Sequence, residues 1–488
     1  MSEQVGVSRK TVNAYAMSGA GRDMMYALYS TFLIVFLTDA LGLLDWQLVA
    51  IGSIIAVARV WDAINDPIMG TIIDNTRSKY GKFKPWILIG ALSSAVIFFL
   101  LFQDLGLSST AFVIVFGILY VLSGMTFTMN DIAYWSMYPS FTTDPSERER
   151  IGSKARIFAS LGMFITIASV PLIYQNFSGG PVKAFSIIAL IICIIYVISQ
   201  VAVFFLVKQP KNIIIDSMQK KTTLLDMVKI IFKNDQLVVI IVAILLFNIG
   251  YFITTALGIY FFNYDFNKYG GAEFTIFSGI LAVSQLTALG LFPVLMKKMS
   301  RKKLFTISVV MIVVGYLLFM SVGYTFIPMN MFFIGLAGLI LFSGQGFIQV
   351  LVLVMLADTI EYGQWKLGTR NESVVFAINP FVTKLATAVQ TFVVTLTLAA
   401  SGLNSGVIQP LTQAKKDNPN LTTEQARALI ASNVSPEMLL GLRLSMIIIP
   451  LLLILLSYFI YRWKYKIDTK FYQQITSDLT DRIMSGDL

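Results

Sequence analysis

The sequence predicts an all-α membrane protein whose twelve transmembrane helices form two halves of six. Of the 488 residues, 56% are hydrophobic and only 13% are charged, whereas charged residues make up about a quarter of a soluble domain. Apolar runs of about 20 residues, long enough to cross a bilayer as a helix, recur along the whole chain. The longest of the predicted cytoplasmic loops divides these runs into two equal groups.

Each apolar run must be helical, because lipid offers no hydrogen-bond partner to an open backbone. The predicted spans cover residues 13–39, 47–75, 84–104, 110–139, 153–178, 183–208, 237–262, 273–298, 302–322, 328–358, 373–402 and 438–463. They give an N-terminal half over 1–208, a central cytoplasmic loop over 209–236, a C-terminal half over 237–463 and a cytoplasmic tail over 464–488. Six plus six helices around a central loop is the major-facilitator architecture, whose halves enclose a cavity at the membrane midplane.

The basic residues indicate which side of the membrane each loop occupies. Of the 37 Lys and Arg, 27 lie in the two tails and in the loops after even-numbered spans, with the adjoining span ends included, and five lie in the other loops counted in the same way. Cytoplasmic loops carry such an excess, so both termini of this multi-pass protein are expected in the cytoplasm. The N-terminus shows no cleavage pattern of a secretory signal. The net charge of +10 reflects this topology and does not indicate a nucleic-acid partner.

The residue inventory excludes several kinds of chemistry. With no histidine and a single cysteine, Cys193, the sequence offers neither an intrachain disulfide nor a Cys/His metal site. No phosphate-binding G-x-x-x-x-G-K motif occurs, so ATP hydrolysis by this chain is not expected. Transport energy must then come from an ion gradient, and any proton coupling must use carboxylates. We expect no cofactor and no enzymatic activity.

Several charged residues lie deep within the predicted spans, where each costs about 2.5–3.5 kcal/mol on insertion scales. An ionisable residue inside the membrane is a candidate for function by default, and the alternative is a structural ion pair between helices. These residues are Arg22, Asp23, Arg59, Asp62, Asp66, Asp131, Arg156 and Lys384.

The second span holds the richest group, in the stretch "WDAINDPIMG". Asp62 and Asp66 are four residues apart and project from one face of a helix. Asn65 and Arg59 fall on the same side, three residues after and before Asp62. Two stacked carboxylates repel each other when both are ionised, and they coexist if a cation lies between them or if one is protonated. The pattern predicts a site for a coupling cation, either Na⁺ or H⁺.

The fourth span, "MTFTMNDIAYWSMYP", predicts a neighbouring site for a small polar ligand. Thr128, Asp131 and Trp135 share one helix face through i+3 and i+4 spacing. A carboxylate accepts from sugar hydroxyls, and an indole stacks on the apolar face of a pyranose, which together orient such a ligand. The alternative for Trp135 is a place in the aromatic belt at the membrane interface. Arg156 in the fifth span can donate in a fork to hydroxyls or pair with an aspartate.

Two loops carry helical patterns of their own. In the central loop, "TTLLDMVKIIFKND" is amphipathic and is expected to lie along the membrane surface as a short helix. In the polar stretch 403–437, on the outer side, "TTEQARALIA" predicts one helix that begins after a threonine cap.

The stretch "ARVWDAINDPIMGTIIDNTRSKYGKFKPWILIG" (58–90) closely resembles the signature of the glycoside–pentoside–hexuronide:cation symporters, the melibiose permease family. The segments "ADTIEYGQWKL" (357–367), "GMTFTMNDIAYWS" and "KNDQL" agree as well, and the likeness runs from about residue 13 to 466. The family's cation-site positions correspond to Asp62, Asn65, Asp66 and Thr128. Its sugar-site positions correspond to Asp23, Asp131, Trp135 and Arg156, with Arg22 and Lys384 matching basic residues near the sugar.

The chain departs from the melibiose permease pattern at two positions. Alignment on "ADTIEYG" places Gln349 where that permease has a tryptophan and Asn379 where it has a glutamine. Both residues are expected to line the substrate site. Because this lining differs from that of the melibiose permease, the resemblance does not imply melibiose as the substrate. Some relatives carry a histidine-bearing regulatory domain after the last span. The tail here ends about 25 residues later without histidine, and that regulation is not expected.

The resemblance implies a secondary transporter of a bacterial cell membrane that imports a glycoside together with Na⁺ or H⁺ by alternating access. A monomer in the lipid bilayer is expected to suffice. A lipid or drug carrier of the same fold is the nearest alternative, but it would need a wide apolar cavity instead of paired carboxylates. A membrane enzyme would need a large soluble domain or a metal motif. A sensor on this fold would bind sugar without moving it.

Overall fold

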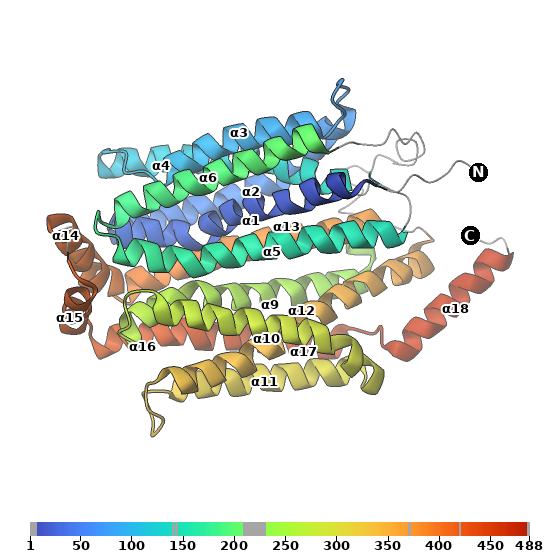
Figure 1. Ribbon diagram of the computed structural model, residues 1–488. Coiled ribbons are helices and arrows are strands. Elements are labelled where there is room, and N and C mark those ends of the chain that lie inside the picture. Colours follow the sequence, from blue (N-terminus) through green and yellow to red (C-terminus); the bar gives the residue numbers. More distant parts are fainter. Residues whose placement is uncertain are drawn as a thin grey trace. The chain divides into compact units, whose positions relative to one another are not determined.

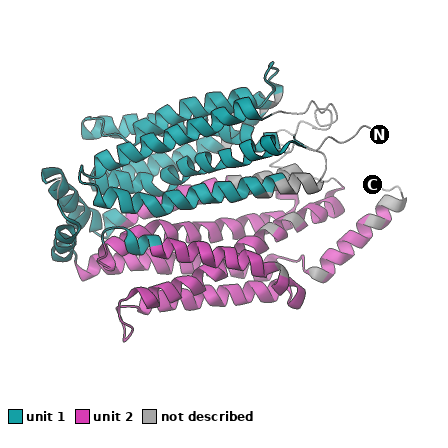
Figure 2. Ribbon diagram, viewed as in Figure 1, with its two compact units in different colours: residues 1–221, 269–275, 398–434 teal, residues 222–268, 276–397, 435–488 magenta. Residues whose placement is uncertain are grey.

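A computed structural model describes residues 7–138, 141, 145–207, 231–368, 372–418 and 421–485 (Figure 1). Throughout these residues the regular secondary structure is entirely helical. The chain divides into two compact units (Figure 2). Unit 1 comprises residues 1–221, 269–275 and 398–434, and unit 2 comprises residues 222–268, 276–397 and 435–488. The sequence-based division at 209–236 remains a prediction.

Unit 1, over its described residues, contains six long helices and a smaller helical segment. The long helices are α1 (Arg9–Val35), α2 (Asp45–Asn75), α3 (Lys84–Leu101), α4 (Ser109–Met137), α5 (Pro145–Asn176) and α6 (Pro181–Leu206). A π-helical turn, η1 (Phe36–Ala40), extends α1. The smaller segment contains η4 (Asn404–Ile408), α14 (Gln409–Asp417) and α15 (Thr423–Asn433). The helix predicted in "TTEQARALIA" is confirmed as α15, and the Thr422 side chain caps it by accepting from the Gln425 amide.

The described part of unit 2 follows the same plan. Its long helices are α9 (Asp235–Tyr260), α10 (Ala272–Lys298), α11 (Arg301–Ser321), α12 (Met331–Leu367), α13 (Glu372–Ala400) and α17 (Ile449–Lys464). The first turn of α10 and the last residues of α13 are assigned to unit 1. A π-helical turn, η3 (Phe261–Asp265), extends α9, and α16 (Pro436–Arg443) and η5 (Leu444–Ile448) lead into α17.

Two structural features were not predicted from the sequence, and one predicted segment lies largely outside the described residues. The π-helical turns were not predicted, because they leave the hydropathy pattern of a span unchanged. The tail forms a helix, α18 (Thr469–Ser485), that packs on α12, where the indole nitrogen of Trp365 donates to Asp478 at 3.1 Å. The amphipathic segment predicted in the central loop lies largely outside the described residues.

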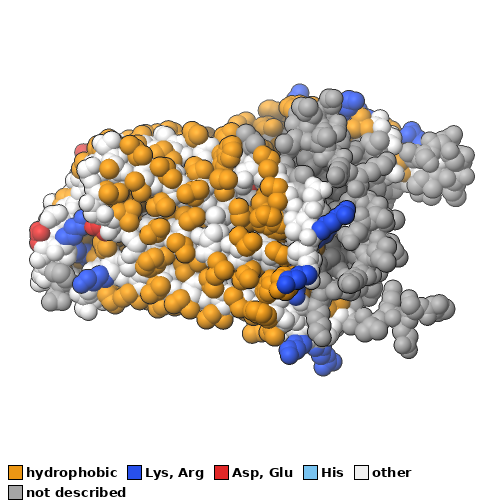
Figure 3. All heavy atoms as spheres, turned by 90° about the horizontal axis from the view of Figure 1, so that it is seen from above, with side chains coloured by type: hydrophobic (Ala, Val, Ile, Leu, Met, Phe, Trp, Pro, Cys, Tyr) orange, Lys and Arg blue, Asp and Glu red, His pale blue; other side chains and the backbone are white. Residues whose placement is uncertain are grey.

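Ten of the described helices are long and apolar enough to cross a membrane. The helices α1 and α2 have a similar length and carry additional charged residues. On the face shown in Figure 3, hydrophobic side chains cover the middle of the surface, while Lys and Arg appear toward its two ends. Exposed apolar residues on these helices include Val57, Val96, Ile118 and Ile198. Such a surface suits lipid, which is as apolar as these side chains.

Close approach of the helices positions the charged residues of unit 1. The helix α1 packs against α5 and α6, and α2 packs against α4. At Gly162 on α5, an added Cβ atom would lie 2.2 Å from the carbonyl oxygen of Ala20 on α1. Small residues allow transmembrane helices to approach this closely, so Gly162 sets the spacing between α1 and α5.

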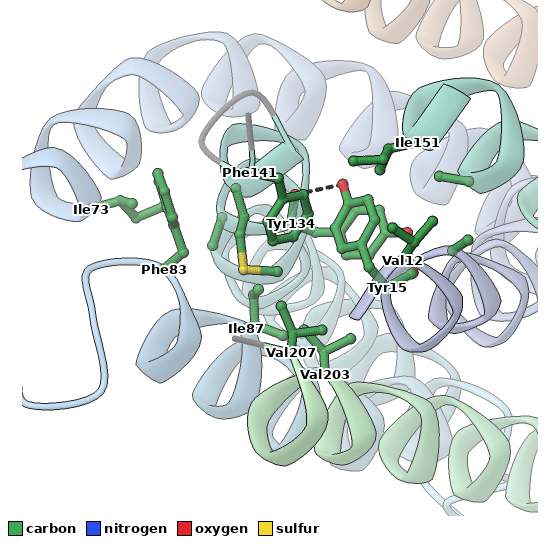
Figure 4. Close-up of a cluster of buried hydrophobic side chains, with 14 of the residues drawn as sticks. Val12, Tyr15, Ile73, Phe83, Ile87, Tyr134, Phe141, Ile151, Val203 and Val207 are labelled. Atoms are coloured by element: carbon green, nitrogen blue, oxygen red, sulfur yellow. Dashed lines mark hydrogen bonds between the residues drawn. The ribbon is translucent and has the colours of Figure 1, made fainter. Parts of the chain in front are cut away.

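A buried aromatic cluster fixes α1 against α4 (Figure 4). The rings of Tyr15 and Tyr134 stack with centroids 4.4 Å apart. Each hydroxyl donates to the backbone carbonyl of the other tyrosine at 2.9 Å. These two hydrogen bonds define the register of α1 on α4, and they align Arg22 of α1 with Asp131 of α4.

Candidate functional site

Arg22 is the centre of one charged group in unit 1. Its guanidinium donates to Asp23 from Nη2 at 2.6 Å and from Nε at 2.9 Å, and to Asp131 from Nη1 at 2.8 Å. The side chain of Arg22 is 4% exposed, whereas that of Asp131 is 36% exposed. The three residues therefore form one network, and the Asp131 carboxylate remains accessible to a ligand. The sequence indicated each residue separately but did not show that Arg22 joins the two aspartates.

Trp135 borders this network on α4. The guanidinium carbon of Arg22 lies 4.7 Å from the centroid of its ring, and that of Arg156 lies 5.1 Å away. A cation over an aromatic face contributes roughly 0.5–2 kcal/mol. Arg156 is exposed and Trp135 is half-buried. A pyranose that stacks on this indole would displace the exposed Arg156, whose donors could then bind its hydroxyls.

A second charged group lies on α2. The Nη1 atom of Arg59 donates to Asp62 at 3.1 Å, and both side chains are at most 9% exposed. The Arg59 guanidinium also lies over the rings of Tyr29 and Tyr120, at 5.8 and 5.7 Å. Because its Nε atom is buried with no hydrogen-bond partner among the described residues, Arg59 is held mainly by Asp62 and by aromatic faces.

Asp66 links α2 to α4. It accepts from the hydroxyl of Thr128 at 2.9 Å, so two residues predicted to hold the cation are brought together. Asn65 on α2 is 7% exposed, and its amide nitrogen lacks a hydrogen-bond partner in the described part of the chain. Amide oxygen and nitrogen exchange places by a flip of the side chain. Asn65 can therefore present an oxygen to a cation without moving its backbone.

Gly124 on α4 makes room for the Asp62 carboxylate and was missed by the sequence analysis. An added Cβ atom at Gly124 would lie 2.5 Å from Oδ1 of Asp62. The available signal was a small residue on α4 one turn before Thr128, on the helix that faces α2. Small residues in membrane helices usually indicate helix packing, and here the same smallness accommodates a charged side chain.

The remaining candidates belong to unit 2. Gln349 on α12 and Lys384 on α13 are both half-buried. The Lys384 backbone carbonyl accepts from the Thr387 hydroxyl at 2.7 Å. Asn379 also lies on α13, but its side chain is outside the described residues. The assignment of these three to the substrate stays a prediction.

The two groups of unit 1 share a charge pattern. Each contains two carboxylates and one guanidinium, so each carries a formal charge of −1 when its members are ionised. The α2 group adds the amide of Asn65 and the hydroxyl of Thr128, and such oxygen ligands suit a hard cation. Among the described side chains, no group of three or more Asp, Glu, His or Cys could hold a metal ion. Thr128 and Asp131, one turn apart on α4, connect the two groups.

Comparison with known proteins assigns the chain to a family. Residues 14–469 match the family described as "MFS/sugar transport protein". The chain belongs to this family. The lactose permease of Leuconostoc lactis is 32% identical over 500 residues, which cover 97% of this chain and 72% of that protein. The raffinose carrier protein of Pediococcus pentosaceus is 32% identical over 407 residues, which cover 80% of this chain and 62% of that protein.

Membership of the MFS/sugar transport family confirms the predicted fold class and the resemblance to glycoside–pentoside–hexuronide symporters. The protein is a multi-pass membrane transporter and not an enzyme, with twelve transmembrane helices in two halves. A bacterial homologue of the human lysosomal transporter Spinster has the same fold, with a TM-score of 0.61 at 11% identity over 93% of this chain and 95% of that one. The identity is too low to carry more than the fold.

Proposed function

We propose that the protein imports a glycoside, such as an oligosaccharide, a pentoside or a hexuronide, together with Na⁺ or H⁺ across a bacterial cell membrane. Both termini lie in the cytoplasm, and a single chain suffices. The observation that carries the proposal is the bridge through α4. Thr128 contacts Asp66 in the α2 group, and Asp131, one turn later, contacts Arg22 in the other group.

In the proposed mechanism the cation binds first. It neutralises the formal charge of −1 on the α2 group by taking oxygen ligands from Asp62, Asn65, Asp66 and Thr128. If the cation is H⁺, one carboxylate takes the proton and the other keeps the charge that pairs with Arg59. Because Thr128 and Asp131 share a helix face, a shift of Thr128 toward the cation also moves Asp131 relative to Arg22. Cation binding thereby orders the sugar site further and raises its affinity for the sugar.

The sugar then engages the second group. Its hydroxyls donate to Asp131 and Asp23 and accept from Arg22 and Arg156, and its apolar ring face stacks on Trp135. The loaded carrier then crosses by the rocking of its halves. One co-transported charge at 100 mV supplies about 2.3 kcal/mol, which supports roughly 50-fold accumulation.

The decisive experiment distinguishes the coupling of sugar transport to the cation from the binding of the sugar itself. Replacing Asp66 with cysteine removes one of the two carboxylates of the cation group, and we expect concentrative uptake of the transported sugar to be lost. Exchange of labelled for unlabelled sugar across vesicles containing the variant should persist, because it needs no gradient. If Asp66→Cys still accumulates sugar against a gradient, the cation site is wrongly assigned.

The identity of the cation is tested on the unaltered protein. Uptake is measured with and without Na⁺ at fixed pH, and with and without a pH gradient at fixed Na⁺. Dependence on Na⁺ alone assigns a sodium symporter, and dependence on the pH gradient alone assigns a proton symporter. Uptake that responds to neither gradient contradicts symport.

A further inference from the structure

A part of the chain that follows the eleventh span belongs to unit 1, although it is distant in sequence from the other residues of that unit. We call residues 398–434, as far as they are described, the cap. The cap and the short segment 269–275 group with unit 1 (Figure 2). The topology prediction places the cap outside the cell. Its elements α14 and η4 pack against the turn η1, which extends α1.

Hydrogen bonds that each involve a backbone group hold the cap and segment 269–275 to residues in the first half of the sequence. The Lys416 ammonium donates to the Leu41 carbonyl at 3.0 Å, and the Asn404 amide donates to the Leu43 carbonyl at 3.0 Å. The amide of Gly270 donates to the side chain of Gln175 on α5 at 2.6 Å. These bonds specify one docked position for the cap.

The docked surface encloses an unusual charged group. Lys415 on α14 is 7% exposed and Asp39 on η1 is 4% exposed. The Lys415 ammonium donates to the Tyr269 hydroxyl at 2.8 Å and lies 4.3 Å from the centroid of that ring. Asp39 accepts from the hydroxyl of Tyr174 on α5 at 3.1 Å. Two buried charges are thus placed at the junction of the cap with α5 and η1, outside the proposed transport site.

Charged or titratable groups surround Lys415 on η1, on segment 269–275, on α15 and on α14 itself. From η1 the group is Asp39, whose negative charge favours the protonated lysine. From the 269–275 segment it is Tyr269, whose pKa is raised above its usual range by burial and by Asp39, so the phenol stays neutral. From α15 it is Arg427, which donates to the Tyr269 carbonyl at 2.9 Å. The neighbouring residue on α14, Lys416, adds a second positive charge.

We propose that Lys415, Tyr269 and Asp39 form a proton-operated latch, which holds the cap on unit 1 and releases it more readily when Lys415 is protonated. The chain runs directly from the cap and from segment 269–275 into helices of unit 2. Release of the latch therefore frees the connections between the units. The proposal rests on the extracellular position of the cap in the proposed function, and it requires neither a particular sugar nor a particular cation.

The sign of the pH effect follows from burial. Desolvation, partly offset by Asp39, lowers the pKa of Lys415 from 10.5 to about 8 in the docked state. A released, hydrated lysine has its ordinary pKa and binds a proton more tightly. The docked state therefore holds fewer protons between pH 8 and 10.5, and raising the pH in this window favours docking by up to roughly tenfold per unit. Below pH 8 the lysine is protonated in both states, and this group confers no pH dependence.

The experiment measures how often the cap opens, through the reactivity of a buried cysteine. Leu411 is one helical turn before Lys415 on the same face of α14, and it is 4% exposed. Leu411→Cys is made in a Cys193→Ser background and treated on intact cells with a membrane-impermeant maleimide. Ser432→Cys on the exposed surface of α15 is the control, because it reports the intrinsic pH dependence of thiol alkylation. The measured quantity is the ratio of the two rates.

We expect this ratio to fall by roughly tenfold or more between pH 7.5 and 9.5. Lys415→Arg, which keeps its charge, should give a high and flat ratio, and Lys415→Met should give a low and flat one. Asp39→Asn removes the charge that favours protonated Lys415, so the fall should begin at lower pH. A flat ratio in the parent, or an unchanged slope in Lys415→Arg, overturns the latch. Absence of labelling at Ser432→Cys overturns the extracellular position of the cap, whatever the transport assays show.

Discussion

Two buried arginines, Arg443 in unit 2 and Arg59 in unit 1, are held in opposite ways. Arg443 is fully buried and pairs with Asp265 of η3. It also donates to the carbonyls of Val322 and Met320 at 2.6 and 3.2 Å. Arg59 instead leaves Nε without a partner among the described residues. The hydrogen bonds of Arg443 are complete, and one carboxylate balances its charge. The hydrogen bonds of Arg59 are incomplete, and two carboxylates, Asp62 and Asp66, lie in its group.

This difference provides a criterion that distinguishes a structural ion pair from a ligand-binding site. A saturated pair has no capacity left for a ligand, so its charges stabilise the fold once they are formed. An incomplete group retains unused polar atoms and an excess charge, and a ligand can supply what is missing. By this criterion we propose the α2 group as a binding site, whereas the Arg443–Asp265 pair ties α16 to η3.

The largest expected effect comes from breaking the saturated pair. In Arg443→Met the Asp265 carboxylate is left buried without its partner, which costs about 3–5 kcal/mol of folding free energy. Thermal unfolding of the purified protein in detergent should show a large loss of stability. The same substitution at the exposed Arg156 should change stability by less than about 1 kcal/mol. Equal losses in the two variants would contradict the comparison.

An intermediate effect is expected from crowding the incomplete group. In Gly124→Ala the new methyl group meets the Asp62 carboxylate, so Asp62 must move and the apparent affinity for the coupling cation should fall. We expect a loss of roughly 10- to 100-fold, or about 1.4–2.8 kcal/mol, in the cation dependence of sugar uptake. Gly117→Ala on the same helix is the control, because its methyl group would meet Ile54 at an ordinary 3.4 Å. Similar affinities in the two variants would show that Asp62 does not hold the cation.

The smallest expected effect concerns Asn65. Its amide nitrogen has no partner in the described residues, so Asn65→Leu should change stability without the cation by less than about 1 kcal/mol. The stabilisation that the cation confers on the parent protein, measured as a shift in unfolding temperature, should be lost. Asn130→Leu is the matched control. Asn130 donates to the Ile87 carbonyl at 2.8 Å, so this variant should lose about 1–3 kcal/mol yet keep the cation response.

Much of the fold could be predicted, because a bilayer imposes a length and an apolar composition on every span. The observed α3 (Lys84–Leu101) and α10 (Ala272–Lys298) follow the predicted spans to within a few residues. The π-helical turns and α18 have no comparable signature. A π-helical turn has the same composition as the helix that it extends. The helix α18 contains both polar and apolar residues, and it packs on α12.

The site was predictable only where its residues share one helix. The spacing of Asp62, Asn65 and Asp66 on α2 places them on one face, and the structure agrees. Contacts between helices depend on packing that sequence spacing does not encode. The network of Arg22 with Asp131 and the role of Gly124 therefore emerged from the structure, as did the saturation of Arg443. The sequence alone does not show that the hydrogen bonds of Arg443 are complete while those of Arg59 are not.

The close approach at Gly162 separates two quantities that are easily confused, namely distance from the substrate and sensitivity to mutation. Any side chain at Gly162 would push α5 away from the backbone of α1 at Ala20. Since α1 carries Arg22 and Asp23 and α5 carries Arg156, both sides of the proposed sugar site would move apart. A saturation-mutagenesis screen scored by growth on the sugar would rank Gly162 beside the binding residues, although a residue without a side chain has nothing with which to hold a hydroxyl.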